Sequence, residues 1–90
     1  MKRFLHLLML SLILAACNPS QSALNDLQKF TDRIEQKSER WSEADWDDAL
    51  MHFSEITQTI DRYDYTDEQQ RTIDELKMRC IAQFYEHQSR

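Results

Sequence analysis

The absence of glycine from all 90 residues, with a single proline at position 19, most constrains what this chain can fold into. Apolar residues recur at intervals of three and four through most of the chain, which is the period of an α-helix. The alternating apolar and polar pattern of a half-buried strand is missing. The sequence therefore predicts an all-α protein.

Three amphipathic segments follow one another, at about 22–40, 43–63 and 67–87. An apolar stripe at helical spacing is expected to face the core in each of them. In the first segment the stripe consists of Leu24, Leu27, Phe30, Ile34 and Trp41. In the second it consists of Trp46, Ala49, Leu50, Phe53, Ile56, Ile60 and Tyr63. In the third it consists of Ile73, Leu76, Cys80, Ile81 and Phe84.

Two capping boxes separate the predicted helices. Ser42 and Asp45 have the spacing for the second helix, and Thr66 and Gln69 have it for the third. Short connections between amphipathic helices imply antiparallel neighbours, so we expect a small up-down-up three-helix bundle over residues 23–90. The rival arrangement is a hairpin of the second and third helices with a looser first helix, completed by a homodimer.

The first seventeen residues have the organisation of an export signal. Lys2 and Arg3 precede a mostly apolar run over 4–16, which is shorter than the ~20 residues of a membrane-spanning helix. The run ends in Leu14-Ala15-Ala16-Cys17, which resembles a bacterial lipobox. The resemblance implies that residues 1–16 are a signal peptide that is removed. It also implies that Cys17 carries fatty acyl chains such as palmitate, and that residues 17–22 form the lipidated cysteine and a polar tether.

The residue after the cysteine indicates which of the two bacterial membranes holds the protein. Asn18 stands where an aspartate marks inner-membrane retention in enteric lipoproteins, so the resemblance implies the outer membrane. Acidic residues, common just after the cysteine in surface-exported lipoproteins, are missing here, which favours a domain facing the periplasm. The alternative is an ordinary signal peptide in which Cys17 is an unmodified neighbour of the cleavage site.

Charge excludes two classes of partner. Removing 16 of the 90 residues leaves 74, and removing Lys2 and Arg3 from the 11 basic residues leaves 9 against 16 acidic ones, a net charge of −7. Such a surface repels phosphate groups, so we expect no nucleic-acid partner. It also lacks the basic residues needed for docking on anionic lipid. Attachment to the membrane is therefore expected to depend on the lipid of Cys17.

The sequence contains no motif that supports a catalytic or metal-binding site. Taken as a calcium loop, Asp45 and Asp47 would fill the first and third positions, but Ala49 and Leu50 fall where an oxygen ligand and a glycine are required. Phosphate loops and hydrolase elbows need glycine as well. We therefore expect no catalytic residue, no metal site and no cofactor, and the protein is not predicted to be an enzyme. Cys80 has the spacing of a core residue.

The residues Trp41, Asp45, Trp46, Asp47 and Asp48 are the candidate contacts for a protein partner, because aromatic residues are enriched in binding hot spots. The competing interpretation is structural: Trp41 precedes the Ser42 N-cap and is placed to pack on Trp46. The predicted function is a non-enzymatic, lipid-anchored envelope protein with an interaction or structural role. The alternative is a lipoprotein that binds or scavenges a small molecule or a metal ion.

The mature part also shows a family resemblance. Trp41-Ser42-x-x-Asp45-Trp46, followed by Tyr65-Thr66-Asp67-Glu68-Gln69, resembles the helix starts of a group of small helical lipoproteins from Bacteroidota over about residues 26–84. That group has no known function. The resemblance thus implies a helical, envelope-anchored protein and supplies no site residues.

Overall fold

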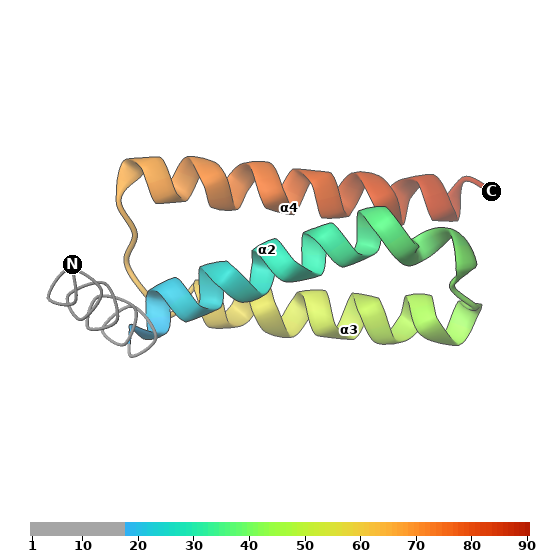
Figure 1. Ribbon diagram of the computed structural model, residues 1–90, viewed down its shortest axis with the longest axis horizontal. Helices are drawn as coiled ribbons and strands as arrows, with labels where there is room; N and C mark the ends of the chain where they lie inside the picture. The colour runs from blue at the N-terminus through green and yellow to red at the C-terminus, as the bar shows by residue number, and fades with distance from the viewer. Residues whose placement is uncertain (1–17) are drawn as a thin grey trace, which may run out of the picture.

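The computed structural model describes residues 18–90, which form a compact all-α domain of three helices (Figure 1). The helices are α2 (Pro19–Lys37), α3 (Glu43–Ile60) and α4 (Asp67–Gln88), and the short 3₁₀ helix η1 (Ser38–Arg40) ends the first of them. The prediction of a three-helix bundle is confirmed. The predicted signal peptide and Cys17 lie outside the described residues.

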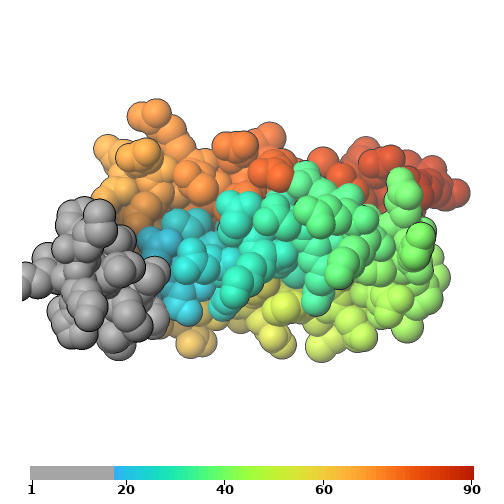
Figure 2. Space-filling view, in the orientation of Figure 1, coloured from blue at the N-terminus to red at the C-terminus, as the bar shows by residue number. Residues whose placement is uncertain are grey.

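Helix α2 lies across the other two and contacts both of them (Figure 1). Helix α3 runs back along the bundle and α4 runs forward again, so the order is up, down, up. In the space-filling view α2 covers the middle of one face, with α4 along one edge and α3 along the other (Figure 2). The first helix is therefore the centre of the packing rather than a loose addition to a hairpin.

The first helix begins earlier than expected. We predicted a polar tether over 17–22, but α2 starts at Pro19 and Asn18 is its N-cap. The Asn18 side-chain oxygen accepts hydrogen bonds from the backbone nitrogens of Ser20 at 3.1 Å and Gln21 at 3.5 Å. Proline suits the first helical position because its missing N–H would have no partner there. Pro19 therefore favours the extended backbone of Asn18 and is also the first residue of α2.

Both predicted capping boxes form. Asp45 N–H donates to Ser42 Oγ at 3.2 Å, and Ser42 N–H donates to Asp45 Oδ2 at 3.0 Å. At α4, the Thr66 and Gln69 side chains exchange the equivalent bonds at 3.0 and 3.1 Å. These bonds satisfy backbone donors that the helix itself leaves open.

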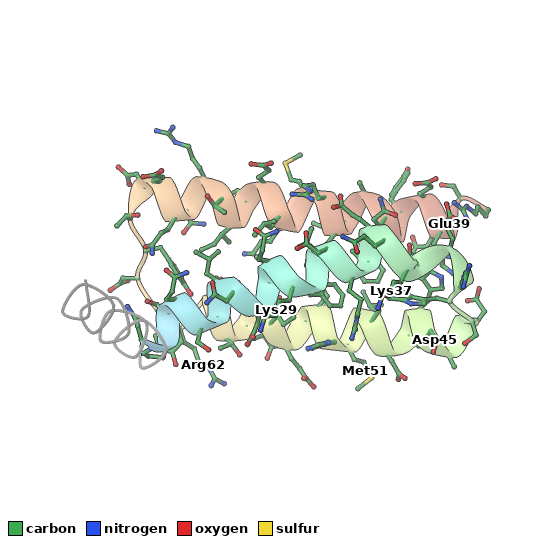
Figure 3. All side chains as sticks on the ribbon, viewed as in Figure 1. Lys29, Lys37, Glu39, Asp45, Met51 and Arg62 are labelled. Atoms are coloured by element: carbon green, nitrogen blue, oxygen red, sulfur yellow. The ribbon has the colours of Figure 1, made fainter. Side chains whose placement is uncertain are left out.

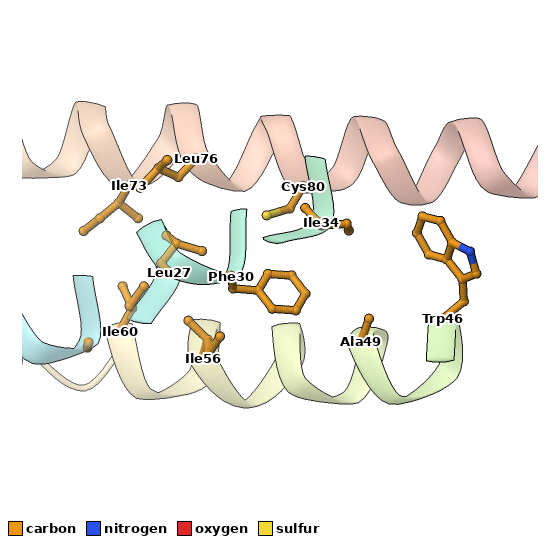
Figure 4. Packing of buried hydrophobic residues seen from close by; sticks show 11 residues of the cluster. Leu27, Phe30, Ile34, Trp46, Ala49, Ile56, Ile60, Ile73, Leu76 and Cys80 are labelled. Atoms are coloured by element: carbon orange, nitrogen blue, oxygen red, sulfur yellow. The ribbon is translucent and has the colours of Figure 1, made fainter. Parts of the chain in front are cut away.

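The core runs along the line where α2 meets α3 and α4 (Figure 4). Phe30 of α2 points between α3 and α4, where it packs with its neighbours on both sides. The buried apolar residues are Ala23, Leu27, Phe30, Ile34, Trp46, Ala49, Ile56, Ile60, Ile73, Leu76 and Cys80. Ala23 and Thr31 are buried where the sequence pattern had favoured Leu24, which is only half-buried.

Three residues expected in the core are exposed, so their prediction was wrong. Leu50 is 51% exposed and Ile81 is 53% exposed. Each lies at the margin of its apolar stripe, and a single crossing helix covers only one side of α3 and α4. Tyr63 is exposed because α3 ends at Ile60, before the expected boundary.

Candidate functional site

The turn between α2 and α3 carries the predicted aromatic pair. Trp46 is buried and Trp41 is half-buried, and their rings meet edge to face with centroids 5.2 Å apart. Trp41 therefore packs on the helix entry as the residue before an N-cap is expected to do. Of the two, Trp41 alone keeps substantial exposed surface for a partner.

The three candidate aspartates are all exposed, but they do not converge. Asp45 and Asp48 line a hollow of about 340 Å³ beside Trp41, whereas Asp47 lines a different hollow beside Leu50. The Asp45 carboxylate is also held by the Ser42 backbone through the capping box. Asp45 and Asp48 are three positions apart and share a helix face, whereas Asp47 is two and one positions from them and points elsewhere.

We call the first hollow, with its lining residues, the α2–α3 corner; it consists of Arg33, Trp41, Asp45, Asp48, Ala49 and His52. The Arg33 guanidinium carbon lies 5.8 Å from the centroid of Trp41, close enough for a cation–π contact. The His52 ring packs edge-on against Phe30 at 5.3 Å. Figure 3 shows Asp45 at the end of α3 that borders this turn.

The C-terminal end of α4 makes a contact that the sequence did not predict. His87 stacks on Trp46 with ring centroids 4.2 Å apart and planes 12° from parallel. Its Nε2 lies 3.1 Å from a carboxylate oxygen of Glu43. His87 lies three residues after Phe84, so both are on the same inner face of α4. Through these contacts with Trp46 and Glu43, His87 packs the end of α4 against the start of α3.

The sequence did not predict the ion pair between α2 and α4 either. Arg79 donates from Nε to Glu35 Oε2 at 3.1 Å, and its terminal nitrogen pairs with the other carboxylate oxygen. This two-point geometry is the strong form of an Arg–carboxylate contact. The hydrogen bonds from Arg79 lower the pKa of Glu35 below its ordinary value, while burial works in the opposite direction.

The Glu35–Arg79 pair gives a prediction for pH dependence. Because the pKa of Glu35 is lowered in the folded state, the pair's stabilisation is present at neutral pH and is lost as the pH falls through that pKa. Replacing Glu35 with glutamine should lower the free energy of unfolding at pH 7 by less than about 1 kcal/mol, since the pair is partly exposed. The difference from the parent should shrink at acid pH, as the Glu35 carboxylate becomes protonated. Urea unfolding followed by circular dichroism measures both values.

The control for that prediction is Glu39→Gln. Glu39 is exposed and makes no ion pair with a described residue, so its substitution should change stability by less than Glu35→Gln at pH 7. Equal effects of the two variants at neutral and at acid pH would contradict a role for the pair.

Cys80 is fully buried, which confirms its assignment to the core. Its sulfur lies 3.1 Å from Thr31 Oγ1, and that hydroxyl donates to the Leu27 carbonyl at 2.7 Å, which leaves the thiol to donate to Thr31. Burial raises the pKa of the Cys80 thiol. A protonated, enclosed thiol is a poor nucleophile.

We therefore predict that Cys80 in the native protein reacts with iodoacetamide at least about tenfold more slowly than in urea, because only the thiolate attacks. Mass spectrometry of the labelled protein measures the rate. A variant with Ala82→Cys supplies an exposed thiol on the same helix and should react rapidly without denaturant. Native labelling of Cys80 at the rate of that exposed thiol would show that the core opens readily.

Tyr65, in the connection before α4, is half-buried, and its hydroxyl is enclosed without a hydrogen-bond partner among the described residues. Desolvation raises the pKa of Tyr65. Over residues 18–90, no group of three or more metal-ligating side chains is assembled. In the same region, no helix is both long enough and apolar enough to cross a membrane.

The geometry leaves the α2–α3 corner as the candidate site, with one half-buried tryptophan between an arginine and two carboxylates. Comparisons of the chain with protein-family models, with curated proteins and with solved structures found no match.

Proposed function

We propose that this protein is a non-enzymatic lipoprotein of the bacterial envelope whose helical domain binds a protein partner at the α2–α3 corner. Acyl chains on Cys17 hold it to the outer membrane, and the domain faces the periplasm. Support for the anchor comes from the lipobox-like sequence before Cys17. Helix α2 starts two residues after Cys17, so the lipid holds the bundle close to the bilayer surface.

The composition of the α2–α3 corner is the observation that supports a partner-binding site there. Asp48 is exposed beside half-buried Trp41, and none of the ion pairs between described residues includes it. An aromatic ring flanked by a free carboxylate suits a partner that presents a lysine or arginine next to an apolar side chain. Such a partner is also favoured over long range by the acidic surface.

Photo-crosslinking in cells tests the corner. A photoreactive amino acid at position 41 of the full-length protein should capture one reproducible envelope protein, and Asp48→Lys should reduce that capture at least tenfold because it places like charges together. Glu75→Lys makes the same charge change on exposed α4 and should leave the capture unchanged. No reproducible captured protein, or equal losses in both variants, would contradict the proposed site.

The alternative of a small-molecule or metal carrier remains a second candidate. Ligand sites of this kind are concave and bury most of the ligand, whereas the α2–α3 corner is an open surface hollow and the line between the helices is filled by side chains. Titration calorimetry with calcium and zinc salts is expected to give no binding heat. Saturable heat with either ion would favour the alternative.

A further inference from the structure

The α2–α3 corner is one end of a longer groove between the same two helices. Three hollows follow one another along it, of about 340, 260 and 170 Å³. His52 lines all three, and neighbouring hollows also share Arg33 or Asp26. In Figure 1, α2 starts over α3 and ends closer to α4, so the space beside α3 widens toward the corner. We call the three hollows together the α2–α3 groove; it runs from Trp41 to Thr59.

The hollows recur at the period of a helix. On α3, the residues that line them in turn are Ala49, His52 and Ile56, three and four positions apart. A helix rises about 1.5 Å per residue, so the hollows follow one another about every 5 Å. Each hollow is also lined by a buried apolar residue: Ala49 in the first, Phe30 in the second and Ile56 in the third. Side chains on one face of another helix have the same spacing, which is how a helix binds in a groove.

The two sides of the groove carry opposite charges. Exposed Lys29 and Arg33 line it from α2, and exposed Asp48 and Glu55 line it from α3. None of the ion pairs between described residues includes any of these four. At the narrow end the α2 side is acidic as well, because Asp26 lines the hollow there. The groove thus holds a basic side and an acidic side apart, and their charges are left to a ligand that lies between them.

We propose that the partner occupies the α2–α3 groove with a single amphipathic helix. This inference rests on the proposed partner site at the corner and states what binds there. Apolar side chains from three successive turns of the partner helix enter the hollows. Its flank toward Lys29 and Arg33 carries acidic residues, and its flank toward Asp48 and Glu55 carries basic residues. Such a match of opposite charges on both flanks fixes the orientation and the register of the helix.

Photo-crosslinking at both ends of the groove tests this proposal in the full-length protein in its own membrane. Photoreactive residues at positions 41 and 59 should capture the same envelope protein. Position 51 is the control: Met51 is 64% exposed on α3 but lines none of the three hollows, so its capture should be at least tenfold weaker. Capture from position 41 without capture from position 59 would overturn the groove-bound helix and leave the corner site intact. No capture from either position would overturn both.

The crosslinked peptides distinguish a helix from an extended chain. From Asp45 at one end of the groove to Thr59 at the other, α3 spans about 21 Å at 1.5 Å per residue. A partner helix covers that length in about 14 residues, whereas an extended segment needs about six at 3.3 Å per residue. The sites captured from positions 41 and 59, identified by mass spectrometry, should therefore lie about 14 residues apart in the partner. A separation of about six residues, or sites in two distant segments, would refute the helix.

Charge reversals test the two flanks. Glu55→Lys and Lys29→Glu should each reduce capture from position 41 at least tenfold, because each brings like charges together. Neither residue lines the hollow at the corner, so these losses report on the rest of the groove. Glu75→Lys and Arg71→Glu make the same charge changes on exposed α4 and should leave capture unchanged. All four residues are exposed, so each variant should retain its helical circular dichroism. Undiminished capture in Glu55→Lys and Lys29→Glu would rule the proposal out.

Discussion

Replacing Trp46 with alanine is expected to lower the free energy of unfolding by about 3–5 kcal/mol, the range for a buried large aromatic residue. The ring is buried at one end of the bundle, between the turn that precedes α3 and the end of α4. It contacts Trp41 edge to face, Phe84 at 5.7 Å and His87 in a parallel stack. A core of this size rarely supplies more than about 3–5 kcal/mol of net stability, so the variant should be largely unfolded.

The control is Trp41→Ala, which removes the same side chain from a half-buried position. It should cost only about 1–2 kcal/mol, because most of its lost contact is one edge-to-face pair and one cation–π contact. Urea unfolding of the purified protein in detergent, followed by far-ultraviolet circular dichroism, compares the two variants. A smaller loss for Trp46→Ala than for Trp41→Ala would contradict the assignment of Trp46 to the core.

Replacing Cys17 with serine is expected to move the protein from the membrane to the soluble fraction. A diacyl anchor contributes about 0.8 kcal/mol for each buried methylene group, and two chains make attachment stable. Over residues 18–90, no helix is long and apolar enough to span a membrane. The net charge without residues 1–16 is −7, which disfavours docking on anionic lipid. Fractionation of cells that express the full-length variant measures the change.

Cys80→Ala is the matched control for that experiment. It removes the other cysteine, which is buried between α2 and α4, and should leave the protein in the membrane fraction. Retention of Cys17→Ser in the membrane would mean that something other than the lipid holds the chain there.

The helix starts were the part of the fold most readable from sequence. A capping box is a local arrangement of four residues, so Ser42 and Thr66 could be assigned without knowing what α3 and α4 pack against. The predicted start of α2 was wrong because the local sequence fits two structures. Asn18 and Pro19 fit a polar tether, and they equally fit an N-cap followed by a first helical residue, which is what the structure shows.

The burial of residues at the edges of the apolar stripes could not be predicted from the sequence. Leu50 and Ile81 continue apolar stripes by spacing, but their exposure depends on which side α2 covers. That choice is made by packing between segments far apart in the chain, such as Phe30 against His52 and Glu35 against Arg79. The pairing of His87 with Glu43 is equally non-local, and the sequence did not predict it.

The most direct test of the proposed anchor is the mass of the N-terminal fragment of the protein isolated from its own membrane. We expect a fragment that begins at Cys17, without residues 1–16, and that carries the added mass of a diacylglycerol and, where the amine is acylated, a third fatty acid. A fragment that begins at Cys17 with no added lipid, or that still includes residues 1–16, would contradict it.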